Sequence, residues 1–121
     1  MRLFVFIFLL YFTIPVTAAD NNGNYAIWGY GNKSCYAYNL SRAAKDDNKF
    51  RDYAMGYLTA YNHQTAETYS ISRDMNLDEV LAWLDEQCSL KPIISYEEAL
   101  VDFIAENYDK RMKFSPNGFG R

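Results

Sequence analysis

Residues 76–88, with the sequence NLDEVLAWLDEQC, constrain the fold most, because they predict a complete helix that ends in a cysteine. Asn76 is a suitable N-cap, and Glu79 three residues later completes a variant of the capping box. Apolar side chains then recur every three or four residues, which places them on one face of the helix. These side chains are Leu77, Val80, Leu81, Leu84 and Cys88. We therefore expect the cysteine to face the protein core.

The first residues have the features of a secretory signal peptide. Arg2 supplies a positive charge, residues 3–12 are mostly apolar, and residues 16–19 have the small-residue sequence VTAA. A membrane-spanning helix needs roughly 20 apolar residues, which is longer than this run, although an uncleaved anchor is the alternative. We predict that residues 1–19 are a cleaved signal peptide. The mature protein is then periplasmic or secreted, with no attachment to a membrane.

The chain has two cysteines, Cys35 and Cys88, and neither lies in a Cys-x-x-Cys motif. In an exported protein such a pair predicts a structural disulfide, because the compartment is oxidising. Two reduced and buried cysteines are the alternative, which export disfavours. We therefore expect the domain to pack around the helix at 76–88 and to be tethered to it by a Cys35–Cys88 bridge.

Three further helices are predicted in the mature chain. Ser34 caps a helix from Cys35 to about residue 44, and a longer helix follows from about residue 49 to 62. Ser95 and Glu98 form a capping box for the last helix. Residues 63–75 are polar and predict a loop, with at most a short extended piece at 68–72. The fold class is therefore all-α, a small single-domain bundle of about four short helices stapled by one disulfide.

The segments that flank the bundle are irregular by the same reasoning. Residues 20–33 are rich in Asn, Gly and aromatic side chains without periodicity, which predicts an N-terminal arm. Within this arm we expect Trp28 and Tyr30 to pack onto the domain, and an exposed aromatic patch is the alternative. The helical domain then spans residues 34–112, and residues 113–121 form a flexible tail.

The residues that would support catalysis are absent from the sequence. It contains no G-x-S-x-G, P-loop or H-E-x-x-H motif. The only histidine, His63, is interpreted as a solvated residue at the end of a helix. The acidic side chains of the helix at 76–88 are expected on its outer, solvated face; they are Asp78, Glu79, Asp85 and Glu86. We therefore expect no enzyme activity, no cofactor and no bound metal.

The net charge of the mature chain indicates which kinds of partner it can bind. Without Arg2, eleven basic side chains face fifteen acidic ones, a net charge of −4. An acidic chain is a poor ligand for nucleic acid or for an anionic membrane. We therefore expect a protein partner, including a second copy of the chain in a possible homodimer.

The second helix suggests where such a partner would bind. Its apolar side chains form the strongest amphipathic pattern of the chain: Phe50, Tyr53, Ala54, Tyr57, Leu58 and Tyr61. Gly56 within this helix predicts the close approach of another backbone. Aromatic residues at the edge of a buried face suit an interface that is partly apolar and partly wet. The predicted protein-binding surface is Tyr53, Tyr57, Leu58, Tyr61 and Trp83. The alternative is packing at the edge of the core within the monomer.

Residues 34–104 together resemble the HdeA/HdeB group of small periplasmic proteins. The resemblance rests on five short features in order: Ser34-Cys35, GYLTAYN at 56–62, the Asp-x-Val at 78–80, WLDEQC at 83–88, and Pro92, Ser95, Ala99 and Leu100. It implies an all-α fold with one disulfide and the activity of an acid-stress chaperone. Such chaperones are folded dimers near neutral pH and become partly unfolded, client-binding monomers in acid.

The charges of this chain are compatible with that mechanism. Protonating all fifteen carboxylates and His63 would change the net charge of the mature chain from −4 to about +12, and self-repulsion would loosen the fold. The arm at 20–33 and the loop at 63–75 are longer than in the chaperones. The architecture is also similar to that of periplasmic immunity proteins, which bind and neutralise type VI secretion effectors. An accessory protein without chaperone activity is a third candidate, and we favour the chaperone.

Overall fold

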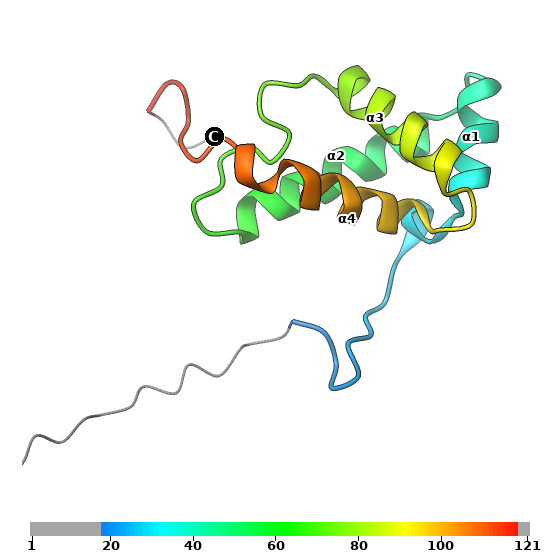
Figure 1. The fold of residues 1–121 in the computed structure, drawn as a ribbon, viewed down its shortest axis with the longest axis horizontal. Coiled ribbons are helices and arrows are strands. Elements are labelled where there is room, and N and C mark those ends of the chain that lie inside the picture. The colour runs from blue at the N-terminus through cyan, green and yellow to red at the C-terminus, as the bar shows by residue number, and fades with distance from the viewer. Residues whose placement is uncertain (1–17, 119–121) are drawn as a thin grey trace, which may run out of the picture.

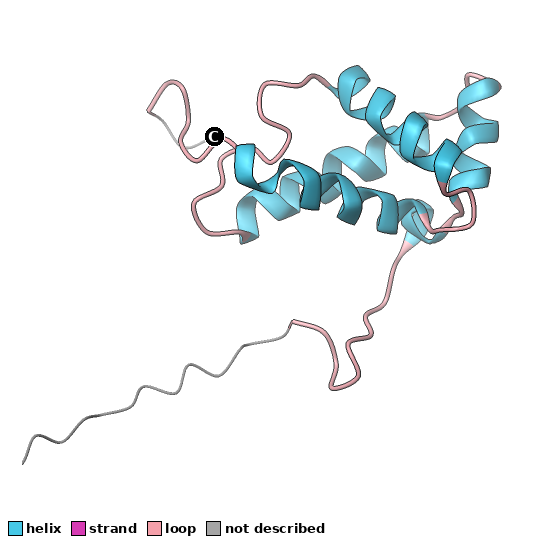
Figure 2. Cartoon of the chain, in the orientation of Figure 1, coloured by secondary structure: helices cyan, strands magenta, loops and turns pink. Residues whose placement is uncertain are grey.

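The computed structural model describes residues 18–118, so nearly all of the predicted signal peptide lies outside the described residues. Four α-helices form the domain: α1 (Cys35–Ala43), α2 (Asn48–Gln64), α3 (Leu77–Leu90) and α4 (Tyr96–Asn107). Short 3-10 turns precede and follow them, η1 (Gly29–Asn32) and η2 (Tyr108–Lys110). The described residues contain no β-strand, only two isolated bridges (Figure 2). The predicted all-α class is confirmed.

The helices begin where the capping residues predict. Ser34 Oγ accepts a hydrogen bond from the N–H of Ala37 (3.1 Å) at the start of α1. In α3 both halves of the capping box form between Asn76 and Glu79. In α4 only the Ser95 half forms, through the N–H of Glu98 at 3.1 Å. Local chemistry therefore fixes the start of three of the four helices.

The core lies where α1, α3 and α4 meet, with α2 packed across them (Figure 1). At its centre are three aromatic rings from three helices, Tyr38, Phe50 and Tyr96, with centroids 4.9–5.4 Å apart. The hydroxyl of Tyr96 donates to the carbonyl of Phe50 at 3.1 Å, which satisfies a fully buried polar group. Aromatic packing thus joins α1, α2 and α4 around one point.

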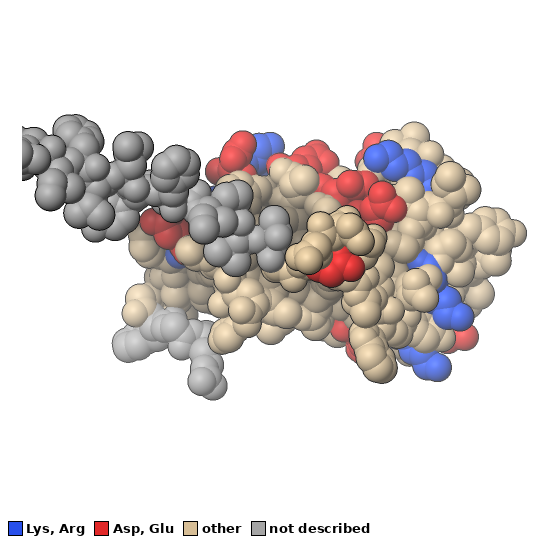
Figure 3. Space-filling model, turned by 90° about the horizontal axis from the view of Figure 1, so that it is seen from below, with Lys and Arg blue, Asp and Glu red and all other residues tan. Residues whose placement is uncertain are grey.

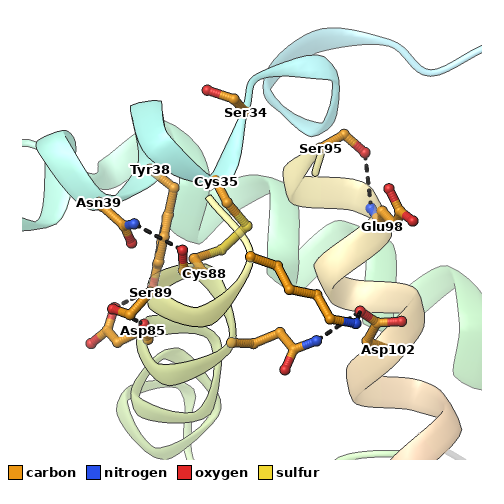
Figure 4. Close-up of a disulfide and its surroundings, with 12 residues drawn as sticks. Ser34, Cys35, Tyr38, Asn39, Asp85, Cys88, Ser89, Ser95, Glu98 and Asp102 are labelled. Carbon is orange, nitrogen blue, oxygen red and sulfur yellow. Dashed lines mark hydrogen bonds and ion pairs between the residues drawn. A yellow bond between two sulfur atoms is a disulfide. The ribbon is translucent and has the colours of Figure 1, made fainter. Parts of the chain in front are cut away.

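A disulfide joins Cys35 at the start of α1 to Cys88 in the last turn of α3, as predicted (Figure 4). Both cysteines are fully buried, and their Cα atoms are 4.9 Å apart. The side-chain amide of Asn39 donates to the carbonyl of Cys88 at 3.0 Å, one helical turn beyond the bridge. The N–H of Cys35 also donates to the carbonyl of Ile94 at 2.8 Å, which ties α1 to the α3–α4 connection. The bridge therefore lies in the most constrained part of the fold.

Of the two aromatic side chains of the N-terminal arm that are predicted to pack onto the domain, only one does so. Tyr30 packs edge-on against Phe50, with ring centroids 4.9 Å apart. Trp28 is 84% exposed, so the prediction that it packs onto the domain is wrong. Gly31 explains how η1 sits so close to α2, because an added Cβ would overlap the ring and hydroxyl of Tyr53. The prediction of a close backbone approach at Gly56 is wrong, since an added Cβ there would meet nothing.

The loop between α2 and α3 is anchored on both sides. Ile71 in the middle of this loop is fully buried, and its N–H donates to Asn62 Oδ1 at 2.8 Å. Ser70 pairs with Met112 of the C-terminal segment in an isolated antiparallel bridge. This bridge is the short extended piece that the sequence predicts at 68–72. The loop is therefore part of the domain.

Replacing Cys35 with Ser should destabilise the domain strongly. The bridge spans 53 positions, and on the chain-entropy model its loss costs about 4 kcal/mol of unfolding free energy. Urea unfolding followed by far-UV circular dichroism measures the change. Reduced wild-type protein is the control and should unfold at a similar midpoint. If the urea midpoint of C35S equals that of the oxidised wild type, the bridge does not have the stabilising role proposed for it.

Candidate protein-binding surface

Four of the five side chains predicted as a binding surface are half-buried in the folded chain. They pack against the core cluster: Tyr53, Tyr57, Tyr61 and Trp83. The fifth, Leu58, is 8% exposed and belongs to the core itself. Its contribution to a surface would require the fold to open.

Tyr53 and Tyr57 lie beside a buried carboxylate. Their rings stack with centroids 5.8 Å apart, and Tyr57 donates to Glu97 Oε1 at 2.5 Å. Glu97 is only 3% exposed, and the hydroxyl of Tyr25 in the arm donates to it at 3.1 Å. Burial, and then the hydrogen bond to Glu97, raise the pKa of Tyr57. The tyrosines of α2 thus hold the start of α4 and the arm together in the folded state.

Trp83 lies on the opposite side of α4. Its ring packs edge-on against Phe103 (centroids 5.3 Å apart), and its Nε1 donates to Glu106 at 2.9 Å. Glu106 and Glu97 are nine positions apart on α4, which is two and a half turns and places them on opposite faces. The folded chain therefore does not bring Trp83 into one patch with Tyr53 and Tyr57.

Several strongly exposed apolar side chains lie outside the surface that the sequence predicts. Ile93 is 91% exposed and Leu90 is 73% exposed. Tyr36 is 60% exposed, and its N–H donates to the carbonyl of Pro92 at 2.9 Å, so it lies beside the α3–α4 connection that carries Ile93. Leu90 and Tyr36 lie off the apolar faces of α3 and α1, and Ile93 lies in a connection without periodicity, so the sequence pattern gave no signal for them. Tyr36 thus lies where the start of α1 meets the α3–α4 connection, and Leu90 is the last residue of α3 before that connection.

Charge is unevenly distributed over the molecule. In the view from below, carboxylates gather over the middle and the upper edge, and most of the Lys and Arg atoms lie toward one end (Figure 3). The lower part of this face is largely uncharged. On this face the two signs of charge are therefore partly separated.

Asp85 is predicted on the solvated face of α3, but the structure places it in contact with α1. Arg42 of α1 forms a bidentate ion pair with Asp85, in which Nε donates to Oδ1 at 2.8 Å and NH2 donates to Oδ2 at 2.7 Å. The hydroxyl of the fully buried Tyr38 donates to Asp85 Oδ1 at 2.7 Å. Figure 4 shows this carboxylate less than one turn from the disulfide. Asp85 therefore joins α1 to α3 beside the covalent bridge.

The surroundings of Asp85 change the ionisation of all three groups. Burial of Asp85 acts to raise its pKa, but the hydrogen bonds from Arg42 and Tyr38 oppose this and prevail, so the pKa is lowered. The hydrogen bond to Asp85 raises the pKa of Arg42. Burial, reinforced by Asp85, raises the pKa of Tyr38. The folded state thus favours a charged carboxylate at this position.

Carboxylates also accept the other hydrogen bonds between side chains of different helices. Arg51 of α2 bonds Asp78 of α3 at 2.9 Å, and Gln87 of α3 bonds Asp102 of α4 at 2.8 Å. Tyr57 to Glu97 joins α2 to α4, and Trp83 to Glu106 joins α3 to α4. Together with the bonds at Asp85, these are all the hydrogen bonds that join side chains of two α-helices among the described residues. Every one of them ends on a carboxylate.

Other kinds of site find no support within residues 18–118. No three His, Cys, Asp or Glu side chains there come together as a metal site. No helix in that range is long and apolar enough to cross a bilayer. Comparisons with protein-family models, with curated proteins and with solved structures found no match.

Replacing Asp85 with Asn should lower stability in a pH-dependent way. Because Asp85 is partly exposed, solvent screens its charge, and we expect a loss of about 1–2 kcal/mol at pH 7. A lowered carboxyl pKa stabilises the fold above the unfolded pKa of about 3.9, and this contribution is lost as the pH falls through the folded pKa. The difference between wild type and D85N in urea unfolding should therefore shrink between pH 5 and pH 3.

Glu86 supplies the matched control for this experiment. It is the next residue of α3, it is exposed, and the described residues offer it no hydrogen bond or ion pair. E86Q removes the same charge and should leave the unfolding midpoint within experimental error of wild type. Equal losses in D85N and E86Q, or a D85N loss that does not change with pH, would contradict the role assigned to Asp85.

Proposed function

We propose that this chain is an exported, non-catalytic chaperone that binds unfolding client proteins in acid, as its resemblance to the HdeA/HdeB group implies. The observation that carries the proposal is the carboxylate at each hydrogen bond between side chains of different helices. Acid removes the charge of every one of these acceptors. A disulfide, by contrast, does not depend on protonation of carboxylates. Low pH would therefore loosen α2 and α4 while α1 and α3 stay joined.

The direction of the effect at Asp85 agrees with this mechanism. Its lowered pKa means that the folded state gains stability from the ionised form. Protonation removes the ion pair with Arg42 and leaves that guanidinium close to Asp47 alone, at 3.0 Å. At the same pH the whole mature chain becomes strongly positive, which adds repulsion. Both effects act below about pH 4, where free carboxyl groups titrate.

Opening would expose the side chains that the sequence indicates as a binding surface. Tyr57 loses a charged acceptor when Glu97 is protonated, and Leu58 and Phe50 on the same helix are buried only while α2 stays packed. Exposed aromatic and aliphatic surface binds the apolar segments of other unfolding proteins. The remaining positive charge would keep such complexes in solution.

A periplasmic immunity protein is the second candidate, and a different observation favours it. A protein that binds a specific effector presents its surface in the folded state. Ile93, Leu90 and Tyr36 are already exposed in the folded chain, and all three lie in or beside the α3–α4 connection. Exposed apolar side chains of this kind are typical of protein interfaces.

A titration of the oxidised mature protein from pH 7 to pH 2 tests the proposal. Three quantities are followed: mass in solution, near-UV circular dichroism, and suppression of the aggregation of an acid-sensitive client. We expect the tertiary signal to fall below about pH 4 together with a gain of client protection. D85N should reach both changes at a higher pH than E86Q does.

Two outcomes would contradict the chaperone. One is a protein that keeps its tertiary signal at pH 2, and the other is unfolding without protection of the client. Either result would favour the immunity protein, for which Ile93→Ser is the informative variant. I93S should weaken binding of a folded partner at pH 7, whereas it should leave acid-induced client protection unchanged.

A further inference from the structure

A hollow of about 740 Å³ lies between the second half of α2 and the loop that follows it. Residues of α2 and residues of the loop both line it. No Asp or Glu lines it, although the chain as a whole is acidic. The lining residues are Thr59, Asn62, His63, Thr68, Tyr69, Ser70 and Arg73.

Arg73 differs from the other arginines of residues 18–118. Arg42 and Arg51 pair with carboxylates, and Arg111 donates to a hydroxyl and a carbonyl. The side chain of Arg73 makes no hydrogen bond or ion pair within that range, and its Nε is buried without an acceptor. Leaving a buried donor unsatisfied costs about 1–3 kcal/mol, so a partner for this group would stabilise the fold. The rest of the side chain is half-buried and borders the hollow.

The backbone at Arg73 is also unusual. Its φ is 59°, in the left-handed region that costs a residue other than glycine about 1–2 kcal/mol. Strain of this kind persists where the surroundings hold it, and it is concentrated at functional sites. The hydroxyl of Ser70 donates to the carbonyl of Arg73 at 2.9 Å and fixes this turn of the loop. The loop thus holds an unpaired guanidinium beside α2.

The neighbouring groups offer further donors and few acceptors. Asn62 Oδ1 already accepts from the N–H of Ile71, so its side-chain NH₂ is the free end. The amide Nε2 of Gln64 lies 3.0 Å from His63 Nδ1, so the other ring nitrogen, Nε2, is the one without a partner among the described residues. The hydroxyl of Thr68 donates to Ala66 and accepts from Arg111. A hollow with free donors and no carboxylate is suited to an anion.

We propose that this hollow binds a small organic anion, whose carboxylate or phosphate head is held by the Arg73 guanidinium and by the side chains of His63 and Asn62. Arginine binds both head groups through paired N–H donors. The ring of Tyr69, which is 37% exposed, offers an apolar wall for the body of the ligand. The ligand would also connect α2 to the loop. This site does not depend on client binding or on an effector.

NMR titrations of the oxidised mature protein at pH 7 test the site with phenyl phosphate and with benzoate as probes. We expect saturable shifts of the Arg73 Nε–H signal and of the side-chain signals of His63 and Asn62. Benzamide has the same ring without the charge and should cause no such shifts. A higher affinity for phenyl phosphate would indicate that the ligand has a phosphate head, and a higher affinity for benzoate would indicate a carboxylate. Absence of saturable shifts with both anions would overturn the proposal.

Variants separate a built site from general attraction of anions. R73N removes the guanidinium and keeps a residue type that tolerates the left-handed backbone, so it should fold and lose at least ten-fold in affinity. K113Q removes the same charge from the exposed C-terminal segment and should bind as wild type does. Equal weakening in the two variants would show non-specific attraction and reject the site. If R73N does not fold, the wild-type titration decides: saturable shifts of the Arg73 Nε–H signal with the anions but not with benzamide support the site, and their absence rejects it.

Discussion

The disulfide bond between Cys35 and Cys88 fixes α1 to α3, and the other helices pack around this pair. It joins the start of α1 to the last turn of α3, and the hydrogen bonds around it fix the α3–α4 connection as well. A chain of this size has a small core, so a restriction of the unfolded state is a large share of its stability. With α1 and α3 fixed to each other, α2 and α4 need only weaker contacts to complete the bundle.

Those weaker contacts are of two kinds, and they respond differently to the solvent. The rings of Tyr38, Phe50 and Tyr96 pack against one another, and this apolar contact does not itself depend on the protonation of a carboxylate. The hydrogen bonds between side chains of different helices end on carboxylates, so their strength falls when those groups are protonated. Under the proposed function, acid would leave the disulfide intact and weaken the hydrogen bonds that end on carboxylates. This division is what makes an acid-opened state with a retained α1–α3 pair physically reasonable.

Much of the fold could be predicted because its determinants are local. The capping residues Ser34, Asn76 and Ser95 act within one helical turn, and the apolar faces follow from helical periodicity, so both can be recognised from sequence. Asp85 could not be, because its burial comes from Tyr38 and Arg42, which are more than forty residues away. Gly31 and Gly56 show the same limit: only the packing of η1 on α2 reveals which glycine is essential.

A sequence pattern can indicate residues that bind a partner, but it does not show whether they bind in the folded or in an opened state of the chain. Leu58 and the tyrosines of α2 lie on one helical face, and in the folded chain that face is used for the core and for Glu97. They can contact a client only after α2 leaves the bundle, which costs the aromatic packing. Ile93, Leu90 and Tyr36 require no such step, because they are exposed in the folded chain. The two proposed functions therefore require different surfaces of one molecule: the chaperone would use a face that the fold covers, and the immunity protein would use side chains that are already exposed.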